Sequence, residues 1–176
     1  MSTDLDRQIF ATSPELRRRL AEAFASFLVS EFVAPGDEIW FVSAWISNID
    51  CLDNRAGDFD ALLGSSPRRW IRLAEVLAGL VRSGRRVRIA LRDVPHNDFI
   101  VRQITTLLGQ PDDRAGWTLK RSPDLHIKGF LGSSLFMSGS MNLTYNGITL
   151  NDEYVLFTRD PEKLAQARLQ FQQSYD

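Results

Sequence analysis

The sequence has few of the residues that form disulfides or metal sites. Among its 176 residues it contains one cysteine, Cys51, and two histidines. A single cysteine cannot form an internal disulfide, and the cysteine and histidines do not have the spacing of a structural zinc site. These shortages predict a cytoplasmic protein, because that compartment is reducing, and we expect neither a metal ion nor another cofactor.

Long apolar runs are also missing. The longest nearly uncharged apolar stretch, residues 39–46, is far shorter than the roughly 20 residues that a transmembrane helix needs. The acidic and polar stretch from Met1 to Asp6 argues against a secretory signal. Neither a lipid-anchor motif nor an amphipathic helix of the membrane-surface type is visible. We therefore expect a soluble protein with no membrane partner.

Neither sign of charge is in large excess. Lys and Arg total 21 and Asp and Glu total 22, giving a formal net charge of -1, so any nucleic-acid binding must be local. Arginine accounts for 18 of the 21 basic residues. Its planar guanidinium suits phosphate oxygens, which makes nucleic acid the favoured partner if the chain binds a polyanion.

The chain is long enough for one hydrophobic core, because 44% of its residues are hydrophobic, and we expect a single domain over residues 1–176. Apolar spacing and capping signals predict helices at 14–33, from Pro67 to near Gly84, at 97–108 and from 161 almost to the end. Strands are predicted at 38–45, 87–92, 117–121, 126–131, 135–138 and 153–158, and a polar loop at 48–60. This order predicts an α/β fold with a mixed, mostly parallel sheet flanked by helices.

Polar side chains gather in the second half of the chain. His126 and Lys128 are two positions apart in a predicted strand, so they share a face of it. The segment Gly139-Ser140-Met141-Asn142 combines a glycine, which permits close backbone approach, with a hydroxyl and an amide. Glu153 opens the next predicted strand, and a carboxylate there can fix an imidazole tautomer. A nucleophile, a cation and two polar groups are thus predicted at one site.

This constellation resembles the phospholipase D superfamily, whose hallmark is His-x-Lys, a downstream Asp, and then Gly-Ser-x-Asn with a Glu on the following strand. The matching positions are His126, Lys128, Gly139, Ser140, Asn142 and Glu153. The resemblance covers chiefly residues 117–158, and the spacing from Ser140 to Glu153 is similar to that of the small single-motif bacterial nucleases, whereas the stretch from Lys128 to Gly139 is about one residue shorter than in the superfamily. The position five residues after Lys128, where the superfamily carries Asp, is Ser133 in this sequence.

The resemblance implies a phospholipase D-like fold and metal-independent hydrolysis of a phosphodiester. His126 would attack the phosphorus and form a phosphohistidine, a second histidine would protonate the leaving oxygen, and water would release the product. Since the chain has one motif, the resemblance implies a homodimer with the site across a twofold axis. Lys128, Ser140 and Asn142 would hold the phosphate oxygens, Gly139 would let substrate approach, and Glu153 would orient the His126 ring.

Other functions stay open at this point. A non-catalytic phosphate- or nucleic-acid-binding subunit of a bacterial DNA-modification or defence complex is the first alternative, and residues 45–55 are similar to a segment of phospholipase D-like proteins encoded with such systems, including the DpdK type. Phospholipid hydrolysis is a third hypothesis. His126 and Lys128 as ordinary exposed strand residues are the simplest alternative. His96, where a predicted strand leads into a helix, is a further candidate for substrate contacts. Arg92 is another, because with Arg85, Arg86 and Arg88 it would line a path for a polyanion.

Overall fold

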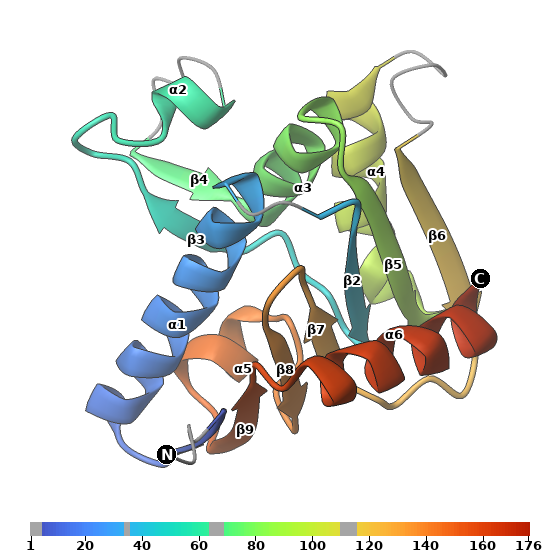
Figure 1. Ribbon diagram of the computed structural model, residues 1–176. Coiled ribbons are helices and arrows are strands. Elements are labelled where there is room, and N and C mark those ends of the chain that lie inside the picture. Colours follow the sequence, from blue (N-terminus) through green and yellow to red (C-terminus); the bar gives the residue numbers. More distant parts are fainter. Residues whose placement is uncertain (1–4, 34–35, 64–68, 110–115) are drawn as a thin grey trace.

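A computed structural model describes residues 5–33, 36–63, 69–109 and 116–176 of the chain (Figure 1). The helices are α1 (Pro14–Val33), α2 (Asp60–Leu63), α3 (Leu73–Arg82), α4 (Asp98–Leu108), α5 (Tyr145–Thr149) and α6 (Pro161–Tyr175), with a 3-10 turn at Pro95–Asn97. The strands are β1 (Asp6–Ala11), β2 (Glu38–Ser43), β3 (Asp50–Asp53), β4 (Trp70–Arg72), β5 (Arg86–Arg92), β6 (Trp117–Ser122), β7 (Gly129–Leu131), β8 (Phe136–Gly139) and β9 (Glu153–Thr158).

Seven strands form one mixed sheet in the order β1-β9-β8-β7-β2-β5-β6. Only the pairs β2–β5 and β5–β6 are parallel, and the four other neighbouring pairs are antiparallel. The prediction of a mixed α/β sheet flanked by helices is confirmed, but the expectation that the sheet is mostly parallel is wrong for its pairing. For one of these pairs the physical reason is local: β7 and β8 are joined by a short turn, which forces them to pair antiparallel.

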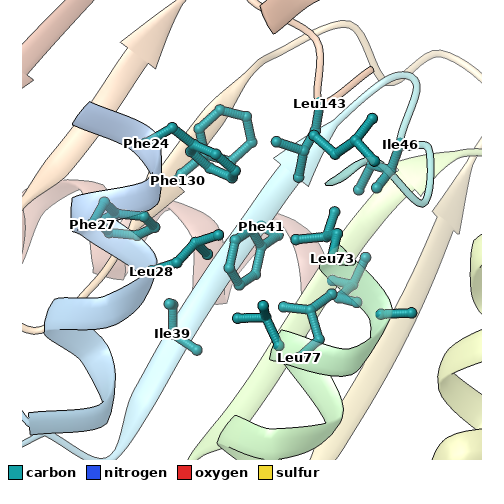
Figure 2. Close-up of a cluster of buried hydrophobic side chains, with 14 of the residues drawn as sticks. Phe24, Phe27, Leu28, Ile39, Phe41, Ile46, Leu73, Leu77, Phe130 and Leu143 are labelled. Carbon is teal, nitrogen blue, oxygen red and sulfur yellow. The ribbon is translucent and has the colours of Figure 1, made fainter. Parts of the chain in front are cut away.

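Successive side chains of β2 point to opposite faces of the sheet, and each face carries its own apolar layer. Ile39 and Phe41 belong to the larger core, which also contains apolar side chains of α1, α3 and α4. Figure 2 shows this core, with Phe24 and Phe27 of α1 around Phe41. Trp40, between them in sequence, points to the opposite face and packs with α6 side chains. The sheet is therefore covered by helices on both faces, and all of β2 is buried.

The helix-capping signals in the sequence locate two helices correctly. The amide of Leu16 donates to the Ser13 hydroxyl at 3.3 Å, and α1 has the predicted bounds. The Asp160 carboxylate accepts hydrogen bonds from the first turn of α6 at 2.9 and 3.4 Å. Such caps satisfy amides that have no partner within the helix, which explains why local sequence fixes these helix starts.

The segment between β2 and α3 differs from the prediction. Residues 50–53, which were expected in a loop, form β3 and pair antiparallel with β4. Trp70, which the helical apolar spacing placed in a helix, lies in β4, and the helix begins at Leu73. The predicted helix start at Pro67 lies outside the described residues. Pairing with a distant strand overrode a local helical pattern here.

Candidate active site

The ends of several strands meet at one end of the seven-stranded sheet. β7 is antiparallel to both β2 and β8, so Gly129 at its start pairs with Val42 in β2 and with Ser138 in β8. β8 is antiparallel to β9, and β5 is parallel to β2. The starts of β7 and β9 and the ends of β2, β5 and β8 are therefore at the same end of the sheet, to which the predicted site residues are attached (Figure 1).

His126 and Lys128 lie in the segment that leads into β7, which begins only at Gly129. The predicted strand over 126–131 is therefore too long. The two side chains are nevertheless adjacent. Lys128 Nζ lies 3.2 Å from Nδ1 and 3.4 Å from Nε2 of the His126 ring, and it donates a hydrogen bond to the His126 carbonyl at 2.7 Å. The ammonium group is thus fixed against the imidazole.

Lys128 and His126 differ in their exposure. The Lys128 residue is only 8% exposed, whereas His126 is exposed to solvent. Burial lowers the pKa of Lys128; the negative charge of Glu153 opposes that shift, and the positive charge of Arg92 adds to it. A cation that is partly desolvated attracts an anion strongly, and the exposed imidazole beside it is accessible to that anion.

Gly139 brings β8 and β9 unusually close. Its φ is +155°, and a Cβ at this position would lie 2.0 Å from the Tyr154 carbonyl oxygen. The close approach lets the Tyr154 amide donate to the Ser140 hydroxyl at 3.0 Å, and that hydroxyl donates to the buried Glu153 carboxylate. Asn151 also reaches Glu153, at 3.5 Å. Ser140 is therefore held in place by the strand next to it.

Glu153 does not have the contact that was expected of it. Its carboxylate contacts Ser140 and Asn151, and no hydrogen bond joins it to the His126 ring within the described part of the chain. It acts on the site through Lys128, whose charged form it favours. The expectation that Glu153 orients the His126 ring is thus not met inside a single chain.

Asn142 is oriented by residues that sequence reasoning did not assign to the site. Its Oδ1 accepts a hydrogen bond from the Trp45 amide at 3.4 Å, and it shares the proton of the Ser43 hydroxyl, 3.3 Å away, with the Trp45 carbonyl oxygen, which lies 3.0 Å from that hydroxyl. This fixes the side-chain oxygen toward β2 and leaves the Nδ2 donors directed elsewhere. Ser43 is fully buried, and a hydroxyl that directly follows the apolar run 39–42 was the signal that could have identified it.

The structure places the two other candidates, Arg92 and His96, in different surroundings. Arg92 ends β5, its guanidinium lies over the Trp45 ring at 5.4 Å, and its charge acts on Lys128. His96 lies in the following 3-10 turn, where its Nε2 is 2.9 Å from the Ser47 hydroxyl. Among the described residues, no contact joins His96 to His126 or Lys128. Arg92 therefore belongs to this region, and His96 is peripheral to it.

Ser133, which replaces the expected Asp, lies at the opposite end of β7 from Lys128. A strand advances about 3.3 Å per residue, so the two positions are roughly 15 Å apart along the chain. The Ser133 amide and hydroxyl both donate to the Glu31 carboxylate at 2.9 Å, and Arg85 reaches the Ser133 hydroxyl at 3.3 Å. Glu31 is completely buried at the end of α1. The Glu31 carboxylate of α1 therefore lies beside position 133.

Residues 5–33, 36–63, 69–109 and 116–176 contain no group of three or more His, Cys, Asp and Glu that could hold a metal ion. In those same ranges, no helix has both the length and the apolar character needed to cross a bilayer. The acidic loop side chains are used in other ways. Asp53 pairs with Arg55, and Asp60 accepts a hydrogen bond from Asn54 at 2.8 Å.

The mixed sheet, with a histidine, a lysine and a Gly-Ser-x-Asn segment at one end, defines a protein of the phospholipase D superfamily. The profile of the family described as "Cardiolipin synthase, PLD-like domain" matches residues 68–175, which is more than half of the chain. The chain therefore belongs to the phospholipase D-like domain family. No curated protein sequence matched it.

Solved structures of low sequence identity share the fold. NucT from Helicobacter pylori has a TM-score of 0.63 at 15% identity, over 96% of this chain and 93% of that one. Nuc, a phospholipase D family member from Salmonella typhimurium, has a TM-score of 0.56 at 14% identity, over 97% and 92%. A phosphatidylserine synthase from Haemophilus influenzae Rd KW20 has a TM-score of 0.57 at 15% identity, over 96% of this chain and 37% of that one.

Proposed function

We propose that this chain is a metal-independent phosphodiesterase, a nuclease that cleaves DNA or RNA through a phosphohistidine. The contact between the Lys128 ammonium and the exposed His126 ring carries this proposal. An anion that binds Lys128 has its phosphorus next to an imidazole nitrogen, which is the geometry that nucleophilic attack requires. We also propose that residues 1–176 form one domain and that the protein is cytoplasmic.

The reaction divides into two steps. In the first, an imidazole nitrogen of His126 attacks the phosphorus, the bond from phosphorus to the leaving oxygen breaks, and a second histidine donates a proton to that oxygen. In the second, water attacks the phosphohistidine, gives a proton to the second histidine, and frees His126. Lys128, the Ser140 hydroxyl and the Asn142 amide stabilise the charge on the phosphate oxygens throughout.

A homodimer would supply the second histidine. The sequence has two histidines, and His96 is hydrogen-bonded to Ser47, with no contact to His126 among the described residues. A twofold axis beside the exposed His126 would bring a copy of the same ring to the other side of the phosphate. The same symmetry would place that second ring near Glu153, giving the carboxylate the orienting role that it lacks within one chain.

The direct test measures hydrolysis in excess EDTA of single-stranded DNA, duplex DNA, RNA and bis(p-nitrophenyl) phosphate. Wild type is expected to cleave at least one of them, and His126→Ala is expected to lose about 10³-fold or more in rate. His126 is exposed, so its truncation should leave the melting temperature unchanged. Equal rates for wild type and His126→Ala, or loss of wild-type activity in EDTA, would overturn the proposed mechanism.

Mixing experiments test the dimer. When wild type and His126→Ala are mixed equally and allowed to exchange subunits, a site that needs two histidines survives only in wild-type pairs, about a quarter of the dimers. Independent monomers would instead keep about half of the activity, since each wild-type chain would act alone. Sedimentation velocity gives the assembly state separately, and a monomer at high concentration would contradict the two-chain site.

A non-catalytic subunit that binds phosphate or nucleic acid in a DNA-modification or defence complex is the second candidate. The observation that favours it is Ser133 in place of the motif aspartate. The experiment above distinguishes the two candidates. If wild type and His126→Ala are equally inert on every substrate while wild type binds oligonucleotides, the binding subunit is the better description.

A further inference from the structure

Arg92 differs from the other partly buried arginines of the described chain. Arg85 reaches Glu31, Arg88 reaches Glu38 at 2.7 Å, and Arg121 reaches Asp98 at 2.8 Å. Within the described ranges, by contrast, the Arg92 guanidinium makes no hydrogen bond or ion pair, and its Nε is buried with no hydrogen-bond partner. Arg92 is partly buried, and a guanidinium that is partly removed from water without an acid to pair with is costly, so such a position favours binding of an external anion.

The side chain is nevertheless held in a defined place. The guanidinium lies over the ring of Trp45 with 5.4 Å between its central carbon and the ring centroid, a cation–π contact. The ring in turn packs against the apolar layer under α6. An arginine held over an aromatic face presents a planar cation with several N–H donors in a defined place, which suits a phosphate group.

A buried amide connects this pair to the site. Asn97 is fully buried; its Nδ2 donates to the carbonyl oxygens of Arg92 at 2.7 Å and Ala44 at 2.9 Å, and its Oδ1 accepts from the Ile46 amide at 2.8 Å. The end of β5 is thus tied to the segment after β2. The Trp45 amide also donates to Asn142 at 3.4 Å. Arg92 and Trp45 therefore stand next to the candidate active site as part of one rigid frame.

We propose that Arg92, supported by Trp45, forms a second anion subsite that binds the phosphate adjoining the one that is cleaved. Lys128 takes the reacting phosphate beside His126, and Arg92 takes its neighbour along the strand. The influence of Arg92 on the Lys128 pKa agrees with this proximity. This inference rests on the proposed function and narrows its substrate class, because a polynucleotide carries adjoining phosphates and a simple diester carries one.

The test compares Arg92→Gln with wild type on two substrates in excess EDTA. For a single-stranded oligonucleotide, the substitution is expected to raise KM about 10-fold and to reduce the slope of log affinity against log salt by about 0.7, the value of one phosphate contact on a single strand. For bis(p-nitrophenyl) phosphate, the change in KM is expected to be clearly smaller than for the oligonucleotide, because that substrate has no second phosphate. Arg92→Lys keeps the charge but not the planar guanidinium, so its KM for the oligonucleotide should be intermediate.

Arg102→Gln is the matched control, since Arg102 is exposed on α4 and its loss makes the same change in net charge. It should leave both substrates unaffected, and melting curves establish that all variants are folded. Equal losses on the two substrates, or no loss on the oligonucleotide, would overturn the second subsite while the proposed hydrolysis stands. If wild type hydrolyses neither of these substrates nor duplex DNA and RNA, the proposed function fails; oligonucleotide anisotropy titrations then decide the subsite alone, with weaker binding by Arg92→Gln supporting it and unchanged binding overturning it.

Discussion

The hydroxyl of Ser133 donates a hydrogen bond to the buried Glu31 carboxylate at 2.9 Å, across 102 positions of the chain. The Ser133 amide donates to the other oxygen of the same carboxylate, and Arg85 contacts both residues. This cluster lies at the end of the sheet opposite to His126 and Lys128. Position 133, where the phospholipase D resemblance predicts an Asp, is therefore remote from His126 and Lys128 within one chain, and α1 provides an acid beside it.

An aspartate at position 133 should destabilise the protein. Ser133→Asp places a second carboxylate against Glu31 in a buried setting, where two like charges repel strongly. We expect lower stability for Ser133→Asp, and partial recovery when Glu31→Gln is added, because one acid then remains with Arg85. The coupling energy of this double-mutant cycle, measured by urea unfolding, should be about 1–3 kcal/mol.

The neighbouring substitution Ser134→Asp provides the control. Ser134 is exposed, so the same added charge should change stability by no more than about 0.5 kcal/mol. A Ser133→Asp variant as stable as wild type would contradict the idea that Glu31 occupies the place of the motif acid.

Gly139 should tolerate no side chain. Gly139→Ala puts a Cβ 2.0 Å from the Tyr154 carbonyl oxygen, so β8 and β9 must separate. We expect a loss of about 1–3 kcal/mol in the free energy of unfolding and a fall in kcat, because the separation moves Ser140 away from Glu153. Gly84→Ala is the comparison: Gly84 has a φ of +91°, and a Cβ there meets nothing within 4 Å. It should lose stability through its backbone conformation alone, with kcat unchanged.

Local sequence signals predicted the helices and strands whose positions depend on residues close by in the chain. The N-caps Ser13 and Asp160 set the starts of α1 and α6, and Arg–apolar alternation gave β5. The strand β1 was not predicted, because it is an edge strand that, among the described residues, pairs with β9 alone, almost 150 residues later in the chain. Trp70 was assigned to a helix for the same reason, since its pairing with β3 is not local.

The candidate site likewise contains residues that local patterns predict and residues that depend on distant pairings. The motif residues were found because their types and spacing are unusual, and the structure brings them to one end of the sheet. Alternation placed His126 and Lys128 together, although the contact comes from the lysine folding back before the strand begins. Glu31 beside Ser133 and Ser43 behind Asn142 depend on pairings about 100 residues apart, and no local pattern encodes them.

Ser43 should act on the reaction through Asn142. Ser43→Ala removes the hydroxyl that donates to Asn142 Oδ1 and that accepts from the Leu143 amide at 3.3 Å. The Asn142 amide then keeps only its bond from Trp45, and we expect kcat to fall about 10-fold with a stability loss of about 1 kcal/mol. If Ser43 is a positioning residue, adding Ser43→Ala to Asn142→Ala should lower kcat little further. Additive losses would contradict this role.

The pKa of Lys128 should move in opposite directions when its two charged neighbours are neutralised. Glu153 favours the protonated ammonium, so Glu153→Gln should lower the pKa further, whereas Arg92 disfavours it, so Arg92→Gln should raise the pKa. The chain has three lysines, and NMR titration of ¹³C-labelled lysine, with Lys128→Met to assign the signal, gives the value directly. The phosphate requires the charged form, so the alkaline limb of kcat/KM should shift to lower pH in Glu153→Gln and to higher pH in Arg92→Gln. Shifts of the same sign in both variants would mean that Lys128 does not lie between these two charges.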